Sequence, residues 1–427
     1  MTRKFALLLV TLALLVPGAP AQAAPDNYTP RPGVTFNSPL GDSATRQAIF
    51  RKILRAINST PRGSDISIFS WNFLTKDGAT ALLRAQARGV RVRLLIDDTN
   101  NTEFVNQPYR RLKAGLIKGN EGRPHSRRSW ARACTGSCRG RTGSAHSKFF
   151  LFSQVGNVKR VVMQGSANLT LASTNNQWND IYIHTRSLPV WRFANRIFDE
   201  AARDEIARRP FASRGFGEFR LIMFPLAGKG ARDPVMTMLN KVKCLGATNT
   251  PNGRTQLRIA PDVIRQNRGM RLAKKVRSLW QSGCDIKVGY TVVGIDIGRM
   301  LRSSAGRGPV PMKHLVQDFN DDGEFDNYFH LKSMSIVGNY NGDRSGYALL
   351  NGSANWSGLA AVSDENLGIY GNKRVVLQYH HHLDYWYNNF PAPRTQLVFG
   401  SGARAVYEDG RRVAVNGVNP FARVETD

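Results

Sequence analysis

Two short segments of the sequence each place a lysine two positions after a histidine. They are His146 with Lys148 and His330 with Lys332. Along a β-strand, side chains two residues apart point to the same face, so each segment would present an imidazole beside an ammonium group. Two such half-sites could share one phosphate. One imidazole would attack phosphorus, the other would protonate the leaving oxygen and then activate water, and the lysines would stabilise charge on the remaining oxygens.

Each histidine and lysine pair is followed by the same run, Gly-Ser-Ala-Asn, at residues 165–168 and again at residues 352–355. The histidines lie 184 positions apart and the runs 187 apart, so the spacing nearly repeats. Glycine permits a close approach, and the hydroxyl and amide groups add neutral partners for an anion. These polar candidates are Ser166, Asn168, Ser353 and Asn355. Because the chemistry needs no metal and no carboxylate cluster in the sequence would hold one, we expect no cofactor.

The elements that must position these motifs also repeat. Strands are expected at residues 65–69 and 90–96 and again at residues 256–259 and 286–293, with a glycine-terminated helix between the members of each pair. A strand, helix and strand in this order give parallel strands with the helix on one face. After each histidine and lysine pair, a strand, a turn and a second strand lead into the Gly-Ser-Ala-Asn run. The sequence therefore predicts an α/β fold with two pseudo-symmetric halves, each a mixed, largely parallel sheet flanked by helices.

The paired motifs resemble those of the phospholipase D superfamily, whose signature is His-x-Lys followed by Gly-Ser-x-Asn. The resemblance covers both halves and implies an active site between them, a covalent phosphohistidine intermediate and no metal at the chemical step. By the same resemblance, His146 is assigned as the nucleophile and His330 as the acid and base. The aspartate that usually follows each lysine in the family is replaced by Ser153 in the first half and by Val337 in the second.

The family also carries an acidic residue downstream of the asparagine, which orients a histidine. Glu365 fits this place in the second half. In the first half Asn179 occupies the place, and Asp180 is the more plausible partner if the register shifts by one residue. The two half-sites are therefore expected to be unequal.

The first residues have the pattern of a secretory signal peptide. Arg3 and Lys4 precede an apolar run at residues 5–16, and small residues around position 23 form a cleavage signature. A membrane anchor is the weaker interpretation, since the run falls well short of the ~20 residues that span a bilayer. We therefore expect a secreted, extracellular protein that is a monomer. The predicted parts are a signal peptide at residues 1–23, an N-terminal half at residues 24–215 and a C-terminal half at residues 216–427.

The chain has only four cysteines, which could form two disulfides in an oxidising compartment. Of the three possible pairings, we prefer Cys134 with Cys138 and Cys244 with Cys284, because each pair then falls within one half of the repeat. A zinc site is the weaker interpretation, since no second cysteine or histidine pair follows at a suitable spacing.

Other polar groups have competing interpretations. Residues 123–141 hold six arginines and lie directly before His146, so they could form a disulfide-closed basic loop that gathers a polyanion, or a solvated surface loop. Asp97 and the following Asp98 are more plausible in a turn or helix cap than in a site. The remaining histidines are interpreted as structural or surface residues, and the run that begins at His380 as a polar helix face rather than a metal site.

The charge of the chain points to its partner class. A formal net charge of +29 attracts polyanions through a salt-sensitive term that does not depend on sequence. The partner would be a phospholipid membrane surface or another phosphodiester polyanion, with nucleic acid possible. The leading prediction is a secreted phosphodiesterase of phospholipase D type that cleaves the head-group phosphodiester of glycerophospholipids. A metal-independent secreted nuclease and a non-catalytic polyanion-binding protein are the alternatives.

Overall fold

The computed structural model describes residues 27–228, 230–320, 322–391, 405–408, 411–415, 420–422 and 424. The predicted signal peptide at residues 1–23 lies outside this part of the chain. Within the described residues, no helix combines the length and the apolar character needed to cross a membrane.

The first half is built on a seven-stranded sheet with the order β1-β10-β7-β6-β2-β4-β5. Its strands are β1 (Gly33–Phe36), β2 (Asp65–Phe69), β4 (Arg91–Asp97), β5 (Trp130–Cys134), β6 (Phe149–Val155), β7 (Val158–Gly165) and β10 (Asp180–His184). Helices α2 (Ala48–Asn58), α3 (Lys76–Ala87) and α5 (Gln107–Lys118) pack against one face and α7 (Leu188–Ala201) against the other. Short helices α1 (Ser43–Arg46), α4 (Thr99–Thr102) and α6 (Ala172–Asn175) and the 3-10 helix His125–Arg127 complete it.

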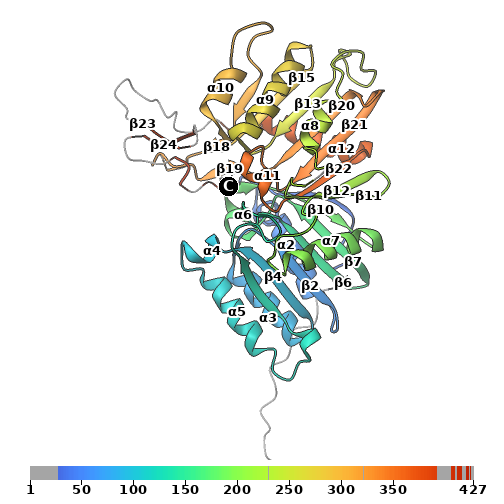
Figure 1. Ribbon diagram of the computed structural model, residues 1–427, viewed down its shortest axis with the longest axis vertical. Coiled ribbons are helices and arrows are strands. Elements are labelled where there is room, and N and C mark those ends of the chain that lie inside the picture. The colour runs from blue at the N-terminus through green and yellow to red at the C-terminus, as the bar shows by residue number, and fades with distance from the viewer. Residues whose placement is uncertain are drawn as a thin grey trace, which may run out of the picture.

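The second half repeats this plan with an eight-stranded sheet, order β11-β12-β22-β21-β20-β13-β15-β17. Its strands are β11 (Ala212–Gly215), β12 (Phe219–Met223), β13 (Gln256–Ala260), β15 (Asp285–Tyr290), β17 (Met312–His314), β20 (Ser333–Tyr340), β21 (Asp343–Gly352) and β22 (Asn366–Tyr370). Helices α8 (Pro234–Leu239), α9 (Gln266–Gln281) and α10 (Ile295–Leu301) belong to the core on one face, and α12 (Lys373–Asn389) covers the other. The second half also contains the short helix α11 (Gly358–Val362). Figure 1 shows the first half below the second.

The predicted α/β architecture of mixed sheets flanked by helices is confirmed, but the expectation that the sheets are largely parallel is wrong. In each sheet only two strand pairs are parallel, and they include the predicted strand-helix-strand units β2-α3-β4 and β13-α9-β15. The other pairs are antiparallel. The tight turn after each histidine and lysine pair accounts for one antiparallel pair in each sheet, β6 with β7 and β20 with β21, because a short hairpin can join only antiparallel strands.

The glycine stops are placed as predicted. Gly89 after α3 and Gly283 after α9 both have φ of +95°, a left-handed conformation that glycine adopts without strain. The second sheet begins at β11, a few residues before the boundary expected at residue 216. The domain boundaries themselves stay a prediction.

Short strands close the ends of the sheets where the site lies. Strand β3 (Phe73–Leu74) pairs with β8 (Leu169–Thr170), and β14 (Val263–Ile264) pairs with β16 (Val292–Val293). A third small sheet crosses between the halves, since β19 (Asn327–Phe329) pairs with β18 (Val316–Gln317) and with β9 (Gln177–Trp178) of the first half. A last hairpin is formed by β23 (Ala405–Glu408) and β24 (Arg411–Val415).

Candidate active site

Both histidine and lysine pairs lie in extended segments that directly precede a strand. Lys148 is followed by β6 and Lys332 by β20. All four side chains are buried, and each ammonium group donates to the backbone carbonyl of its own histidine, Lys148 Nζ at 2.9 Å and Lys332 Nζ at 3.0 Å. The two pairs thus have the same local geometry, which the sequence repeat led us to expect.

The side-chain partner of each histidine comes from the other half of the chain. His146 Nδ1 lies 2.8 Å from Glu365 Oε1, and both residues are fully buried. His330 Nδ1 lies 2.7 Å from Asn179 Oδ1. Since each histidine is engaged at Nδ1, Nε2 is the ring nitrogen suited to reaction at phosphorus.

The backbone explains why Asn179, and not Asp180, faces His330. The His330 N–H donates to the carbonyl of Trp178 at 3.1 Å, just as the His146 N–H donates to the carbonyl of Asp364 at 3.1 Å. In each case the acceptor is the residue before the side-chain partner, so Asn179 and Glu365 occupy equivalent places.

The expectation that Asp180 supports a histidine is therefore wrong. Its carboxylate accepts hydrogen bonds from Asn351 Nδ2 at 2.6 Å and from the Tyr379 hydroxyl at 2.5 Å. It is fully buried, and burial raises the pKa of Asp180, while the hydrogen bonds from Tyr379, Asn351 and Ser166 lower it. Asp180 helps to hold the two halves together beside the site.

The Gly-Ser-Ala-Asn runs brace this arrangement. Ser353 Oγ donates to Glu365 Oε2, and Ser166 Oγ donates to Asn179 Oδ1 at 2.9 Å. Each serine therefore fixes the residue that supports the histidine of the other half. The glycines of the runs permit the close packing, because a Cβ on Gly165 would lie 2.2 Å from the Asp180 carbonyl oxygen.

The asparagines of the two runs are buried against the neighbouring loops. Asn168 Oδ1 accepts from Ser70 Oγ at 3.3 Å, and Asn355 Oδ1 accepts from the backbone N–H of Val263 at 3.3 Å. Both contacts tie a run to the segment of its own half that follows β2 or β13.

Three further residues lie at the half-sites without having been singled out in the sequence. The Trp71 ring packs edge-on against the His146 ring at 5.7 Å between centroids, and Lys148 Nζ lies 5.8 Å from the Trp71 ring centre. Tyr328 packs edge-on against His330 at 5.8 Å. Asp262 Oδ2 lies 2.9 Å from Lys332 Nζ and 4.0 Å from His330 Nε2. None of the three belongs to a recognisable motif, and only the repeat of the preceding strands could have drawn attention to Trp71 and Asp262.

Residues 53–201 match the family model described as the phospholipase D-like domain of cardiolipin synthase. Residues 53–201 are thus similar to a phospholipase D-like domain. The matched segment contains His146, Lys148 and the first Gly-Ser-Ala-Asn run. The predicted resemblance to the phospholipase D superfamily is thus confirmed.

Two solved structures resemble the fold of the chain over both halves. Phosphatidylserine synthase from Haemophilus influenzae superposes with a TM-score of 0.53 at 12% identity, covering 84% of this chain and 86% of that protein. Polyphosphate kinase from Porphyromonas gingivalis gives a TM-score of 0.53 at 10% identity, covering 83% of this chain but 50% of the kinase. At these identities the likeness concerns the fold alone. No curated protein shows significant sequence similarity to the chain.

The disulfide-closed loop before His146 contacts the segment that carries Glu365, the partner of His146. The predicted pairings of Cys134 with Cys138 and of Cys244 with Cys284 are both confirmed. The N–H of Cys138 donates to Asp364 Oδ2 at 2.6 Å, and Ser137 Oγ donates to the same oxygen at 2.9 Å. Since Asp364 directly precedes Glu365, the loop helps to fix the partner of His146.

The buried carboxyl of Asp364 should make stability depend on pH. Burial raises its pKa from 3.8 to about 7, against the lowering effects of Arg139, Ser137 and Cys138. The folded protein then keeps a proton that the unfolded chain releases, so this contribution to stability is complete below pH 3.8 and is lost as the pH rises to about 7. Asp364→Asn should not show this loss. Relative to the wild type, its free energy of unfolding should therefore rise by up to about 4 kcal/mol as the pH rises from 3.8 to about 7. Urea unfolding at pH 4.5 and pH 8 measures it, and a difference that does not change with pH would contradict the assignment.

Three arginines of the basic loop have partners within the protein. Arg127 pairs with Asp65 at 2.8 Å, and Arg139 is buried and pairs with Glu200 at 2.9 Å. Arg123 donates to the backbone carbonyls of Val90 and Gln86. These contacts indicate a structural brace, and they do not test polyanion binding by the loop.

The other candidates occupy structural positions. Asp97 Oδ1 accepts from the Thr99 N–H at 3.0 Å, which fits the expected cap. Burial lowers the pKa of His184, His380 and His382 to about 3, so these rings are neutral at ordinary pH. Among the described residues, the three side chains that could approach one metal ion are Cys134, Cys138 and Asp204, and the two cysteines are joined in a disulfide.

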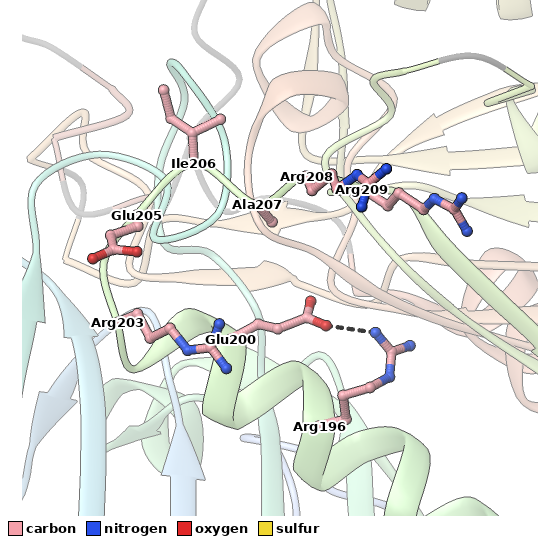
Figure 2. Close-up of a pocket in the computed structure, with 8 residues that line it drawn as sticks. All are labelled: Arg196, Glu200, Arg203, Glu205, Ile206, Ala207, Arg208 and Arg209. Carbon is pink, nitrogen blue, oxygen red and sulfur yellow. Dashed lines mark hydrogen bonds and ion pairs between the residues drawn. The ribbon is translucent and has the colours of Figure 1, made fainter.

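A basic hollow of about 460 Å³ lies at the end of α7, away from the two half-sites. Its lining includes Arg196, Arg203, Arg208 and Arg209. Figure 2 shows Arg196 paired to Glu200 and the side chains of Arg208 and Arg209 extending in the same direction. A neighbouring hollow of about 430 Å³ shares residues 206–208 and reaches Arg141 and Val362. Positive charge therefore gathers on the surface beside the loop that carries Glu365.

Proposed function

We propose that the protein is a secreted phosphodiesterase of phospholipase D type that hydrolyses the head-group phosphodiester of glycerophospholipids. The observation that carries this proposal is the pair of buried histidines, each held at Nδ1 by a residue of the other half. His146 Nδ1 lies 2.8 Å from Glu365 and His330 Nδ1 lies 2.7 Å from Asn179. Two imidazoles held at Nδ1, each beside a lysine, suit nucleophilic attack and proton transfer at a phosphate through Nε2.

In this mechanism His146 is the nucleophile. Its contact with the Glu365 carboxylate keeps a proton on Nδ1 and stabilises the positive charge that develops when Nε2 bonds to phosphorus. His330 donates a proton to the oxygen of the leaving head group and later takes one from the water that attacks the phosphohistidine. Lys148 and Lys332 would hold the non-bridging oxygens of the phosphate, where negative charge grows in the transition state.

The distribution of exposed apolar side chains favours a lipid over a nucleic acid. Leu171 is 53% exposed and its N–H bonds to the carbonyl of Leu74, which is itself exposed. Phe104 and Val105 are exposed beside them, since the next residue, Asn106, donates to the Phe73 carbonyl at 3.0 Å. Leu171 lies three residues after Asn168, and Leu74 lies three residues after Trp71. Apolar loop tips near a phosphate site would insert among lipid head groups.

Two observations support the other parts of the proposal. Disulfides persist in oxidising compartments, so the two that the protein forms support secretion. The net charge of +29 supports attraction to an anionic membrane surface. The same charge, with the basic hollow of Figure 2, favours a metal-independent nuclease as the second candidate.

The deciding experiment offers purified protein phosphatidylcholine vesicles and plasmid DNA in parallel, with and without EDTA. We expect release of choline from the vesicles, unaffected by EDTA and abolished in His146→Ala and in His330→Ala. Cleavage of DNA without release of choline would replace the proposal by the nuclease. Binding of either substrate without turnover would indicate a non-catalytic polyanion-binding protein.

The apolar loop tips predict a specific defect. Leu171→Asp should lower turnover of vesicles by about tenfold, because a charge replaces a side chain whose insertion into lipid is worth about 1.5 kcal/mol or more. Turnover of a soluble short-chain phosphatidylcholine should stay unchanged. Leu245→Asp is the matched control, because Leu245 is 60% exposed and packs near Gly283, at the opposite end of the second sheet. Equal loss on both substrates, or an equal loss in the control, would contradict the role of the loop tips.

A further inference from the structure

Strand register makes Trp71 and Asp262 equivalent positions of the two halves. In the first half Phe69 faces Phe149, the residue after Lys148. In the second half Ala260 faces Ser333, the residue after Lys332. Two residues beyond Phe69 comes Trp71, and two residues beyond Ala260 comes Asp262.

The strands that follow give the same alignment. Phe73 pairs with Leu169, the residue after Asn168, and Ile264 pairs with Trp356, the residue after Asn355. Two independent registers thus place an aromatic ring at one half-site where the other half-site has a carboxylate.

Burial and backbone hydrogen bonds fix the position of the Asp262 carboxylate. The side chain is 1% exposed, and the backbone has a left-handed φ of +60°. The Asp262 carbonyl accepts from the N–H groups of Thr291 and Val292 at 2.9 and 3.0 Å, which fixes the loop. Oδ2 is thereby held 2.9 Å from Lys332 Nζ and 4.0 Å from His330 Nε2.

Each histidine has a carboxylate nearby, but at different ring nitrogens: at Nδ1 of His146 and on the Nε2 side of His330. Glu365 lies at Nδ1 of His146, whereas Nδ1 of His330 meets the neutral Asn179. Asn179 Nδ2 donates to Gln177 Oε1 at 3.1 Å, so its Oδ1 faces His330 and the proton of Nδ1 is the one shared between them. The carboxylate of the second half-site therefore lies on the side of Nε2, the nitrogen that exchanges protons with the substrate.

We propose that Asp262 is a positioning residue that keeps a proton on His330 Nε2 and so makes His330 the acid of the first step. This inference rests on the proposed function. Lys332 is a second charged group near this ring; its ammonium bonds to the His330 carbonyl, and its ion pair with Asp262 offsets its charge. Asn179 and the Tyr328 ring, which also contact His330, carry no charge.

The two steps balance as follows. In the first, His146 Nε2 bonds to phosphorus, the bond from phosphorus to the head-group oxygen breaks, and the proton of His330 Nε2 passes to that oxygen. In the second, water gives a proton to His330 Nε2 while its oxygen bonds to phosphorus and the bond to His146 breaks. The product is a phosphomonoester, and His330 leaves the cycle protonated beside Asp262.

The test varies the need for a proton at the leaving oxygen. Wild type and Asp262→Asn are compared on short-chain phosphatidylcholine, whose alcohol needs protonation, and on the corresponding p-nitrophenyl ester, whose phenolate leaves without it. Asp65→Asn is the matched control, because Asp65 is also paired with basic side chains but begins β2, at the end of the strand away from Trp71. Asp262→Ser serves as a second variant if the amide does not fold.

We expect Asp262→Asn to lower kcat for the choline ester by about tenfold or more, part of the factor that a general acid supplies. The initial release of nitrophenol should stay within about twofold of wild type. A similar loss on both esters, or no loss on either, would overturn the role of Asp262. A wild type that cleaves neither ester would instead overturn the proposed function.

Discussion

His146→Ala is expected to lose turnover of every phosphodiester, whether or not its leaving group needs protonation. His330→Ala should lose only the steps in which a proton is transferred. Without His146 no covalent intermediate can form, so the loss should reach at least about 10⁴-fold on both the choline ester and the nitrophenyl ester. Without His330 the nitrophenolate can still leave, but the phosphohistidine has no base to activate water. The second variant should therefore release one equivalent of nitrophenol and then stop.

Burst kinetics and trapping of the labelled enzyme measure this difference. The phosphorylated His330→Ala protein should hold its label in alkali and lose it in acid, as a phosphoramidate does. His125→Ala is the control, because His125 lies in the exposed 3-10 helix of the basic loop. If His146→Ala gave the burst instead, the two histidines would have exchanged roles. If neither variant trapped label, the covalent mechanism would be wrong.

Glu365→Gln is expected to lower kcat far more than Asn179→Ala, although the two residues occupy equivalent places. The Glu365 carboxylate contacts His146 and accepts from Ser353, and it can stabilise a positive imidazole with a full charge. Loss of a buried carboxylate behind a catalytic histidine lowers rates by about 10²- to 10⁴-fold in comparable sites. Asn179 offers only a neutral oxygen to His330, so its removal should cost about tenfold, the scale of one neutral hydrogen bond.

Steady-state kcat on the soluble choline ester separates the two variants, with circular dichroism and urea unfolding to confirm that both are folded. Asn179→Asp tests the same reasoning in the opposite direction, because it would give both histidines a carboxylate at Nδ1. A Glu365→Gln variant within about threefold of wild type would show that the charge is not used. Equal losses for Glu365→Gln and Asn179→Ala would show that only geometry matters.

The sequence was sufficient to predict the features that depend on patterns within one half of the chain. The repeated His-x-Lys and Gly-Ser-Ala-Asn runs led to the phospholipase D superfamily, which is confirmed, and the glycine stops at Gly89 and Gly283 marked the ends of two helices. The disulfide pairing followed from the repeat as well. Each of these features lies within one half, so the spacing of residues along the chain is enough to detect it.

Contacts between the halves could not be predicted in the same way. Which of two adjacent residues faces His330 depends on the pairing of β9 with β19, and a shift of one residue would turn the other side chain toward it. Asp262 escaped notice because its equivalent, Trp71, is chemically unlike it, so no repeat of residue type revealed the position. The catalytic roles of these residues stay predictions until they are tested.

Each histidine contacts a side chain from the other half of the chain. This arrangement has a consequence for how the two half-sites can become different in evolution. If two identical subunits formed it around a two-fold axis, every substitution would appear on both sides of the phosphate at once. A tryptophan could then not face one histidine while an aspartate faces the other. Here one polypeptide carries both halves, and Trp71 and Asp262 can be selected separately. Covalent linkage thus frees the protein from symmetry, so that one imidazole can specialise in bonding to phosphorus and the other in carrying protons.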